Sequence, residues 1–426
     1  MSSVTNPGRR KLSQGEVEMI VSAHERFVSG KPGGKRAVLK FVDLSNRDLS
    51  GRNLCDADIS ASVLDGAKLI GTKLDRANLF GADLRKADLR RASLVRADLR
   101  GVSLRGADLR QADLTQADFR VGVVAVPHAN KGLAAMSHEQ RHGQLDNANL
   151  VGATLNESQM EDVSAFATDF TDCSMKGAKL NRANFKDANL SGVVFDGADV
   201  GGANFEGANL SYSVMTDLNL SSARVSRATD MTGVLAEPSE EAIARAPKLL
   251  AMILANHLWC RSGGREGAPA VLDGEDLRPL HDKLRGLRLS ACSARGAIMV
   301  GLDLTGAQMQ GANLEGADLR GVCFADADLR GIRLGHANLV KADLRDAVLA
   351  PLPISADRTT PGYLANAKIR YAHAEGCDLT GAVLDGADLA GADFTGAYLD
   401  DASFTGANLQ SVLGLEEVRP RRIKFI

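Results

Sequence analysis

A period of five residues dominates the stretch from position 82 to 119, which reads ADLRKADLRRASLVRADLRGVSLRGADLRQADLTQADF. A small residue begins each unit, and a Leu or Phe follows two places later. An α-helix repeats its apolar face about every 3.6 residues, and a half-buried strand repeats it about every 2. A period of five fits neither structure. It predicts a short extended piece and a turn in every unit, so that the chain coils around an axis.

Each unit is expected to point two side chains inward. The Leu or Phe forms the centre of the unit, and the small residue two places before it faces the same side because side chains alternate along extended chain. The other three positions carry Asp, Asn, Ser, Arg, Lys, Gln and Gly, which suits a solvated face. Gly, Asp and Asn also supply the backbone freedom and local hydrogen bonds of a turn. This pattern predicts a narrow core of Ala and Leu.

Units such as ADLRG, ANLEG, ADLAG and ANFEG resemble those of the pentapeptide-repeat proteins. The resemblance implies an all-β solenoid, a right-handed quadrilateral parallel β-helix with four units per turn. Successive coils would then be stacked about 4.8 Å apart, as paired strands are. The aromatic content of 4% and the 43 glycines agree with a thin solenoid.

The five-residue pattern divides the chain into two solenoid modules, each preceded by a capping helix. We expect a tail and a helix in residues 1–36, where Ser13 and Glu16 fit a capping box. The first solenoid covers 37–235 with a side loop at 120–143, and residues 236–269 form a linker with helices. The second solenoid covers 270–413 with a side loop at 350–361, and residues 414–426 form a tail.

An internal duplication accounts for this order. Aligning Met19 with Met252 without a gap pairs His24 with His257 and residues 37–39 with 270–272. A match of this length predicts a repeated module, with the helix first and the solenoid second. Both histidines are therefore expected to bond a helix end or a first coil. Pro247 is expected to divide the second helical stretch.

Six arginines in the first solenoid form a candidate interaction surface, because each directly follows a centre: Arg85, Arg90, Arg100, Arg105, Arg110 and Arg120. If a coil contains twenty residues, Arg85 stacks on Arg105, Arg90 on Arg110 and Arg100 on Arg120. Such basic ladders could contact an acidic partner or phosphates. Aspartates two positions before most of these arginines would partly neutralise them, and a solvated face of mixed charge is the favoured interpretation.

The sequence from His138 to His142 fits the HExxH text of zinc proteases. Gly143 follows at once, which leaves about one helical turn, so we favour an ordinary polar loop and keep both histidines as candidate interaction residues. The six cysteines include no CxxC pair, and Cys173, Cys292 and Cys377 occupy the small inward position. We therefore expect core cysteines, no metal site, no cofactor and no catalytic residue.

The functional prediction is a non-enzymatic scaffold that binds another protein of unknown identity, or a second copy of itself. The net charge of −2 gives no reason to expect direct nucleic-acid binding. The longest apolar segment, 249–259, is too short to span a membrane, and the start lacks a signal-like apolar run, so we expect a cytoplasmic protein.

Two further observations bear on the partner. The segment 375–401 contains acidic residues without Lys or Arg, in contrast to the Arg-rich first solenoid, which is compatible with head-to-tail self-association. The resemblance also implies an alternative, a DNA-mimicking protein that binds and protects a topoisomerase such as gyrase. Proteins of that kind are generally strongly acidic, and this chain is nearly neutral.

Overall fold

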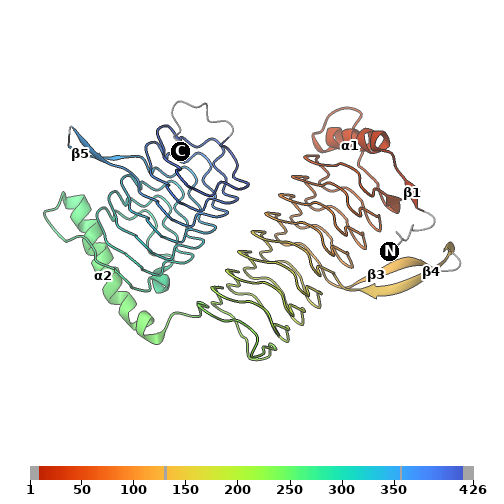
Figure 1. Cartoon of the computed structure of the whole chain (residues 1–426), viewed down its shortest axis with the longest axis horizontal. Helices are drawn as coiled ribbons and strands as arrows, with labels where there is room; N and C mark the ends of the chain where they lie inside the picture. The colour runs from red at the N-terminus through yellow and green to blue at the C-terminus, as the bar shows by residue number, and fades with distance from the viewer. Residues whose placement is uncertain (1–8, 129–131, 356, 416–426) are drawn as a thin grey trace. The chain divides into compact units, whose positions relative to one another are not determined.

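The computed structural model describes residues 9–128, 132–355 and 357–415. The chain forms two compact units, Met1–Glu237 and Pro238–Ile426, which we call unit 1 and unit 2 (Figure 1). Each unit is a stack of coils in which the backbone of one coil pairs in parallel with the next.

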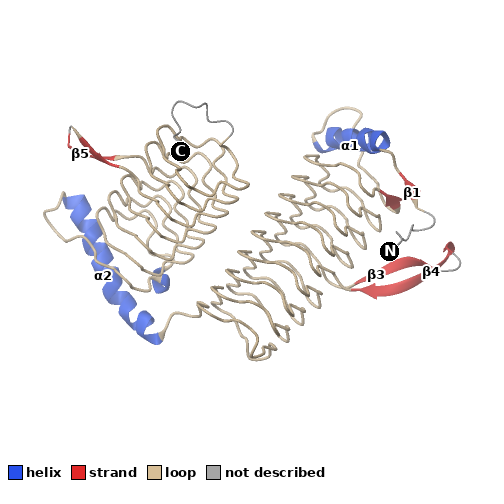
Figure 2. Ribbon diagram, in the orientation of Figure 1, coloured by secondary structure: helices blue, strands red, loops and turns tan. Residues whose placement is uncertain are grey.

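The coils repeat every twenty residues, as the five-residue period predicts. In unit 1, Asp88 pairs with Asp108 and Ser93 pairs with Asp113. The N–H of Leu89 donates to the carbonyl of Asp108 at 2.7 Å, so Leu89 and Leu109 lie in successive layers of one wall. Only one residue of most five-residue units makes such a bridge, and Figure 2 therefore draws most of the coil as loop.

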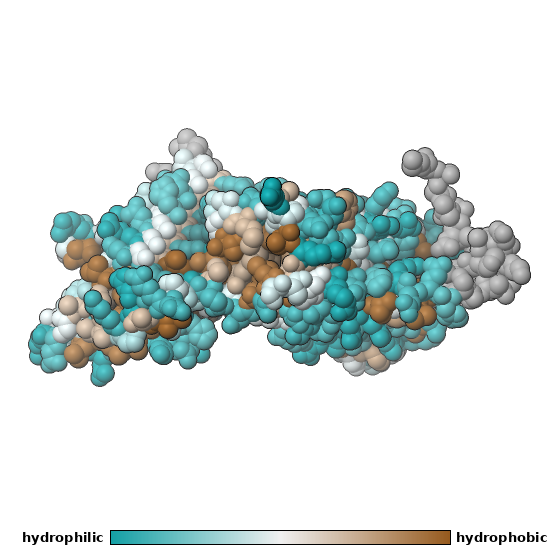
Figure 3. Space-filling model, turned by 90° about the horizontal axis from the view of Figure 1, so that it is seen from below, coloured by the Kyte–Doolittle hydropathy of each residue, from teal (hydrophilic) through white to brown (hydrophobic). Residues whose placement is uncertain are grey.

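The interior contains the residues that the pattern places there. Most centres and most of the small residues two places before them are buried in both units, including the rings of Phe119, Phe185 and Phe205. The residue two places after a centre has a left-handed backbone, for example Lys86 with φ 55° and Gly101 with φ 64°. The polar residues face outward, and the face of the molecule in Figure 3 is mostly hydrophilic.

A helix and a short strand contact the first coil of unit 1. Helix α1 spans Gln14–Val28 and begins with the expected capping box of Ser13 and Glu16. Strand β1, Arg10–Lys11, pairs in parallel with β2, Val42–Asp43. Because the first coil has no coil before it, β1 supplies hydrogen bonds to an edge that would otherwise be open.

Helix α2, Glu240–Ser262, precedes the first coil of unit 2 and corrects one expectation. Pro247 does not divide it: the helix is continuous and ends at Gly263, whose φ is 64°. His257 bonds the first coil as expected, since its Nδ1 accepts from the N–H of Arg288 at 3.0 Å, but the bonds that match those of His24 come from its neighbour Asn256, which contacts Ala270 and Ser290. The short helix η1, Arg278–Leu280, lies where Val271 pairs with Ser293 at a spacing of 22 residues instead of 20.

Both side loops contain a β-hairpin. In unit 1, β3 (Gly122–His128) pairs antiparallel with β4 (Gly132–Arg141). Ser103 then bridges to Gln144, 41 positions on instead of 20, so 21 residues are inserted. In unit 2, β5 (Leu352–Ser355) pairs antiparallel with β6 (Arg358–Thr360), and Arg333 bridges to Tyr363, 30 positions on. Figure 1 shows both hairpins leaving the side of their coil. None of the helices in the described residues combines the length and apolar character that membrane crossing requires.

Candidate interaction surface

Most of the predicted arginines form a local fork with the aspartate two positions before them. Arg90 Nη2 donates to Asp88 Oδ2 at 2.7 Å and Arg90 Nε donates to Asp88 Oδ1 at 2.8 Å. The backbone N–H of Arg90 donates to the same Oδ1 at 3.3 Å. The same arrangement occurs in the pairs Arg85–Asp83, Arg100–Asp98, Arg110–Asp108 and Arg120–Asp118. The sequence Asp-Leu-Arg thus folds into a neutral pair that also fixes the turn.

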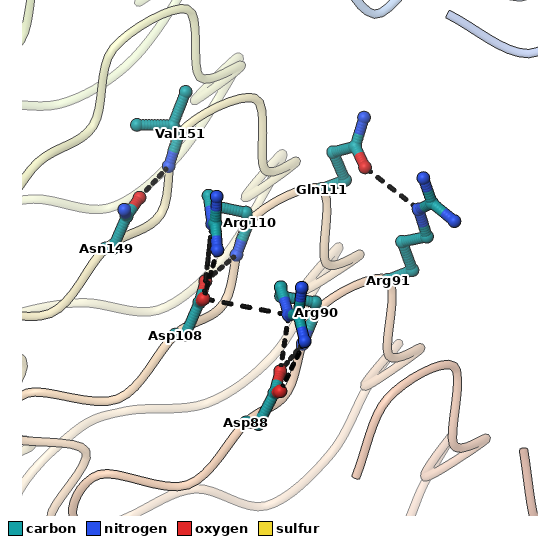
Figure 4. Close-up of polar contacts among 8 residues, drawn as sticks. All are labelled: Asp88, Arg90, Arg91, Asp108, Arg110, Gln111, Asn149 and Val151. Carbon is teal, nitrogen blue, oxygen red and sulfur yellow. Dashed lines mark hydrogen bonds and ion pairs between the residues drawn. The ribbon is translucent and has the colours of Figure 1, made fainter. Parts of the chain in front are cut away.

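The forks are linked between coils. Arg90 Nε lies 3.7 Å from Asp108 Oδ2, and Arg100 Nε lies 3.8 Å from Asp118 Oδ2. Figure 4 shows the Asp88–Arg90 fork beside the Asp108–Arg110 fork, with Arg91 donating to Gln111 further around the coil. Opposite charges alternate along the wall from one coil to the next. This geometry fits the expected face of mixed charge better than a column of unpaired arginines.

Arg105 differs from the other five arginines. Ser103 occupies the place of the aspartate, and Arg105 Nε donates instead to Asp146 Oδ2 in the next coil at 3.0 Å. The side chains of all six arginines are between 37% and 55% exposed, so their outer edges are open to a partner. The expected columns form, because residues 83, 88 and 98 pair with 103, 108 and 118. The columns lie on three different walls, so the six residues do not make one continuous surface.

The forks predict a loss of stability in acid. Hydrogen bonds from Arg90 lower the pKa of Asp88 below the ordinary value of 3.8. Hydrogen bonds from Arg76 in the next coil do the same for the pKa of Asp56, which is an ion pair between coils and not a fork. A carboxylate with a lowered pKa stabilises the fold above its unfolded pKa, and this contribution is lost as the pH falls through the folded pKa. We expect the urea concentration at the midpoint of unfolding to decrease when the pH is lowered below about 4. A midpoint that stays constant down to about pH 3 would contradict this assignment of the forks.

The HExxH segment lies on a strand. His138 belongs to β4 and pairs with Ala125, and His142 follows the end of β4. Side chains four apart on a strand are separated by about 13 Å, whereas the Zn–N bonds of one zinc ion measure about 2.0–2.1 Å. Both histidines are exposed. Across the described parts of the chain, no group of three or more His, Cys, Asp or Glu could hold a metal ion. The arrangement does not fit a zinc protease.

Buried cysteines confirm the expectation of core thiols. Cys173, Cys292 and Cys377 are buried at the small inward position, and Cys173 Sγ donates to the carbonyl of Leu150 at 2.9 Å. Burial raises the pKa of the Cys292 and Cys377 thiols to about 12. A thiol of that pKa is protonated at neutral pH, and the thiolate rather than the thiol is the nucleophile.

The base of the first hairpin packs into a space on the coil, which we call its seat and which the sequence did not indicate. Val124 of β3 is 2% exposed because it packs over a column of glycines. A Cβ atom added at Gly81 would lie 3.0 Å from the Val124 methyls, and one added at Gly101 would lie 2.9 Å from Val124 Cγ2 and 3.3 Å from the Arg141 carbonyl. The glycines thus leave the space in which the base of the hairpin lies.

The second hairpin is seated in the same way. A Cβ atom at Gly331 would lie 2.6 Å from Leu352 Cβ and 3.2 Å from the Thr360 carbonyl, and one at Gly311 would lie 3.4 Å from Leu352 Cδ2. In each unit, two glycines twenty residues apart precede the insertion. This spacing alone does not locate the seats in the sequence, because Gly301 and Gly321 have it too and nothing lies within 4 Å of a Cβ added at either.

Filling the seat should loosen the first hairpin. Gly101→Ala places a methyl group against Val124, whereas Gly71→Ala adds one where nothing lies within 4 Å. Both glycines have a positive φ, 64° and 62°, so both variants carry the same backbone strain of about 1–2 kcal/mol. We expect Gly101→Ala to lose about 1–3 kcal/mol more than Gly71→Ala in urea unfolding. It should also be cut faster by trypsin after Arg141. Equal stability and equal cleavage of the two variants would show that the hairpin does not depend on this contact.

Comparison with known proteins assigns the family. The family model described as pentapeptide repeats matches more than half of the chain, at residues 37–76, 77–116, 144–187, 168–207, 188–227, 283–321, 323–350, 363–401 and 377–412. The chain therefore belongs to the pentapeptide-repeat family, whose members form right-handed quadrilateral β-helices. This confirms the resemblance found in the sequence. The search of curated proteins finds no match.

Several solved structures are similar to this chain. Full-length QnrB1, a plasmid-mediated fluoroquinolone resistance protein, is 20% identical and aligns over 51% of this chain and 95% of its own, with a TM-score of 0.32. HetL, a pentapeptide-repeat protein involved in the regulation of heterocyst differentiation in the cyanobacterium Nostoc sp. strain PCC 7120, is 21% identical over 93% of this chain and 96% of its own, with a TM-score of 0.20. Rfr23 from the cyanobacterium Cyanothece 51142 is 20% identical over 31% and 85%, with a TM-score of 0.16.

Proposed function

We propose that this protein is a non-enzymatic scaffold that binds another protein through the outer surface of unit 1 and its first hairpin. Proteins of the family generally serve structural or interaction roles rather than catalysis. The narrow core is filled by Leu, Phe and Ala, so binding has to use the exterior. We also propose that the two units are duplicated solenoid modules, each closed at its start by a helix, α1 or α2.

The observation that carries the proposal is the anchored base of the hairpin. Val124 is buried against the glycine column, whereas Val121 and Val123 beside it are 42% and 54% exposed. His138 and Glu139 on the paired strand are exposed as well. A two-stranded hairpin is marginally stable alone in water. Fixing its base on the coil therefore lets it present apolar and polar side chains to a partner with little loss of conformational entropy.

A deletion that keeps the register tests this proposal. Removing residues 122–142 takes out the 21 inserted residues, joins Val121 to Gly143 and leaves Phe119 and Leu145 five positions apart. Val121→Gly should accompany the deletion, because this place is a left-handed turn in the coil before, where Gly101 has a φ of 64°. A matched control removes residues 352–361 from unit 2 together with Pro351→Gly.

We expect the intact protein to capture a partner from a lysate of its native host, identified by mass spectrometry. The deletion of 122–142 should lose this partner while its circular dichroism spectrum and melting stay unchanged, and the deletion of 352–361 should keep it. A partner retained at full affinity by the 122–142 deletion would place the contact elsewhere.

The alternative partner, a topoisomerase, is less well supported by the surface. A DNA mimic requires a strongly acidic exterior, and here the aspartates of unit 1 are paired with arginines in forks. We expect an excess of this protein to leave DNA supercoiling by gyrase, and its inhibition by a fluoroquinolone, unchanged. Protection of gyrase from the drug would favour the alternative.

A further inference from the structure

The first coil of unit 1 contains backbone groups that have no earlier coil to bond. In the second coil, the carbonyl of Asp75 accepts from Asp56 N–H of the coil before it, at 2.9 Å. Cys55 occupies the matching place in the first coil, twenty residues earlier, where no preceding coil supplies a donor. Ala37 opens the coil, and its N–H likewise needs an acceptor from outside the repeat. Buried backbone groups without a partner cost about 1–3 kcal/mol each.

The side chain of His24 satisfies both groups. It lies on α1 and is 0% exposed. The N–H of Ala37 donates to His24 Nδ1 at 3.0 Å, and His24 Nε2 lies 3.0 Å from the Cys55 carbonyl. A carbonyl only accepts, so Nε2 carries the hydrogen and Nδ1 carries the lone pair. Only the neutral imidazole with its hydrogen on Nε2 fits this geometry, because a second hydrogen on Nδ1 would face the N–H of Ala37.

In unit 2, the equivalent backbone groups of the first coil are bonded by a residue that does not titrate. Asn256 of α2 is also 0% exposed. Its Oδ1 accepts from Ala270 N–H at 3.2 Å, and its Nδ2 donates to the Ser290 carbonyl at 3.2 Å. Ala270 and Ser290 occupy the places of Ala37 and Cys55, since Ser293 donates to Ala270 as Asp58 donates to Ala37. An amide and a neutral imidazole thus perform the same task in the two units.

The charged groups near His24 do not offer a new partner for an imidazolium. Glu25 on α1 already accepts from Arg52 Nη2 at 2.8 Å and from Asn53 N–H at 3.1 Å. Asp56 on the coil accepts from Arg76 Nη2 at 2.7 Å. Arg36, at the start of the coil, opposes a second positive charge. Burial, the largest of these effects, lowers the pKa of His24 below its ordinary value of 6.5.

We propose that His24 is an acid-sensitive latch, whose protonation releases α1 from the first coil of unit 1. The released state exposes the imidazole to water, where it binds a proton more readily than in the closed state. Opening is therefore favoured as the pH falls below the ordinary pKa of histidine, and closure is fully favoured above it. The latch acts at a higher pH than a carboxylate such as Asp88, whose pKa hydrogen bonds from Arg90 hold below its ordinary value of 3.8.

Hydrogen exchange of the full chain between pH 7.5 and 5.0 tests the latch, after correction for the intrinsic exchange rates. We expect the opening equilibrium of α1 to rise by about 10- to 30-fold, the upper limit being set by an imidazole that is never protonated in the closed state. In His24→Asn, which copies unit 2, the change for α1 should disappear. An α1 whose opening is independent of pH, or an equal rise in His24→Asn, would overturn the proposal.

The histidine itself provides a second measurement, which does not depend on the folding of any variant. In the NMR spectrum of the wild-type protein, the C2 proton of His24 should titrate below the ordinary value of 6.5, and its titration should follow the loss of α1 protection. A titration near 6.5 with α1 still fully protected would show that the closed cap accepts the imidazolium, and the proposal would be wrong.

Discussion

Replacing Phe185 by Ala should lower the stability of the surrounding coils of unit 1 by about 3–5 kcal/mol. The Phe185 ring is fully buried in the core of a coil. Its centroid lies 5.7 Å from that of Phe170 and 5.4 Å from that of Phe205, the corresponding centre one coil later. A thin solenoid has few neighbouring side chains that could move into the cavity, so we expect a cost near the upper end of the range.

Hydrogen exchange of the full chain can measure this loss locally, in peptides from residues 165–210. Phe166→Ala is the matched control, because the Phe166 ring belongs to the same coils but is 41% exposed. Its effect should stay within about 0.5 kcal/mol. If both variants lose the same protection, the inward and outward positions are assigned wrongly.

Among alanine substitutions of the glycines at the second hairpin, Gly362→Ala should lower the stability of unit 2 the most. The chain re-enters the coil at Gly362, where an added Cβ would lie only 2.2 Å from the carbonyl oxygen of Leu349, the last centre before the hairpin. Gly143 occupies the same place after the first hairpin, where the distance to the Phe119 carbonyl would be 2.7 Å. Both contacts are with backbone, so the coil itself has to shift. We expect Gly362→Ala to cost about 3 kcal/mol in the unfolding of unit 2.

Gly15→Ala serves as the control for this variant, because nothing lies within 4 Å of the added atom. Gly15 is in α1, and alanine there should stabilise the protein by about 0.5–1 kcal/mol. A Gly362→Ala protein that unfolds at the urea concentration of the wild type would mean that the re-entry is not as tight as the structure shows.

The coil could be predicted from the sequence because every five-residue unit repeats the same pattern of residue types. The inward position of Leu89, the capping box of Ser13 and the burial of Cys292 all follow from period and propensity, and the structure has each of them. Local signals agree with the global fold at these places, which is the condition under which pattern reasoning succeeds.

The errors occur where tertiary contacts override a local signal. Pro247 stays inside α2 although proline disfavours helix interiors, because Ala246 and Leu249 beside it pack on the core of unit 2. His257 matches His24 in the alignment and accepts from the N–H of Arg288 in the first coil, but the bonds equivalent to those of His24 are made by Asn256. Identity of residue type at aligned positions is thus a poorer guide than the backbone groups that need a partner.

The candidate surface could be predicted only in part. The Asp-Leu-Arg text indicated mixed charge, and the register placed the arginines in columns, but the fork geometry depends on the left-handed turn that follows each centre. The hairpin seat depends on glycines far from the insertion in the sequence, Gly81 and Gly101 for Val124. Contacts of this kind follow from the coil spacing once it is known, and not from any local pattern.

Disulfide trapping tests the twenty-residue coil most directly. Lys73 and Ser93 form a parallel bridge between successive coils, and paired strands lie about 4.8 Å apart, within the range of Cα separations of about 4.4–6.8 Å that a disulfide requires. In a chain with Cys260→Ser and Cys323→Ser, mild oxidation should link Lys73→Cys with Ser93→Cys and should leave Lys73→Cys and Asp98→Cys unlinked, because Asp98 bridges to Asn78 on the next wall. Efficient linkage of 73 with 98, and none of 73 with 93, would contradict the four-walled coil on which this account depends.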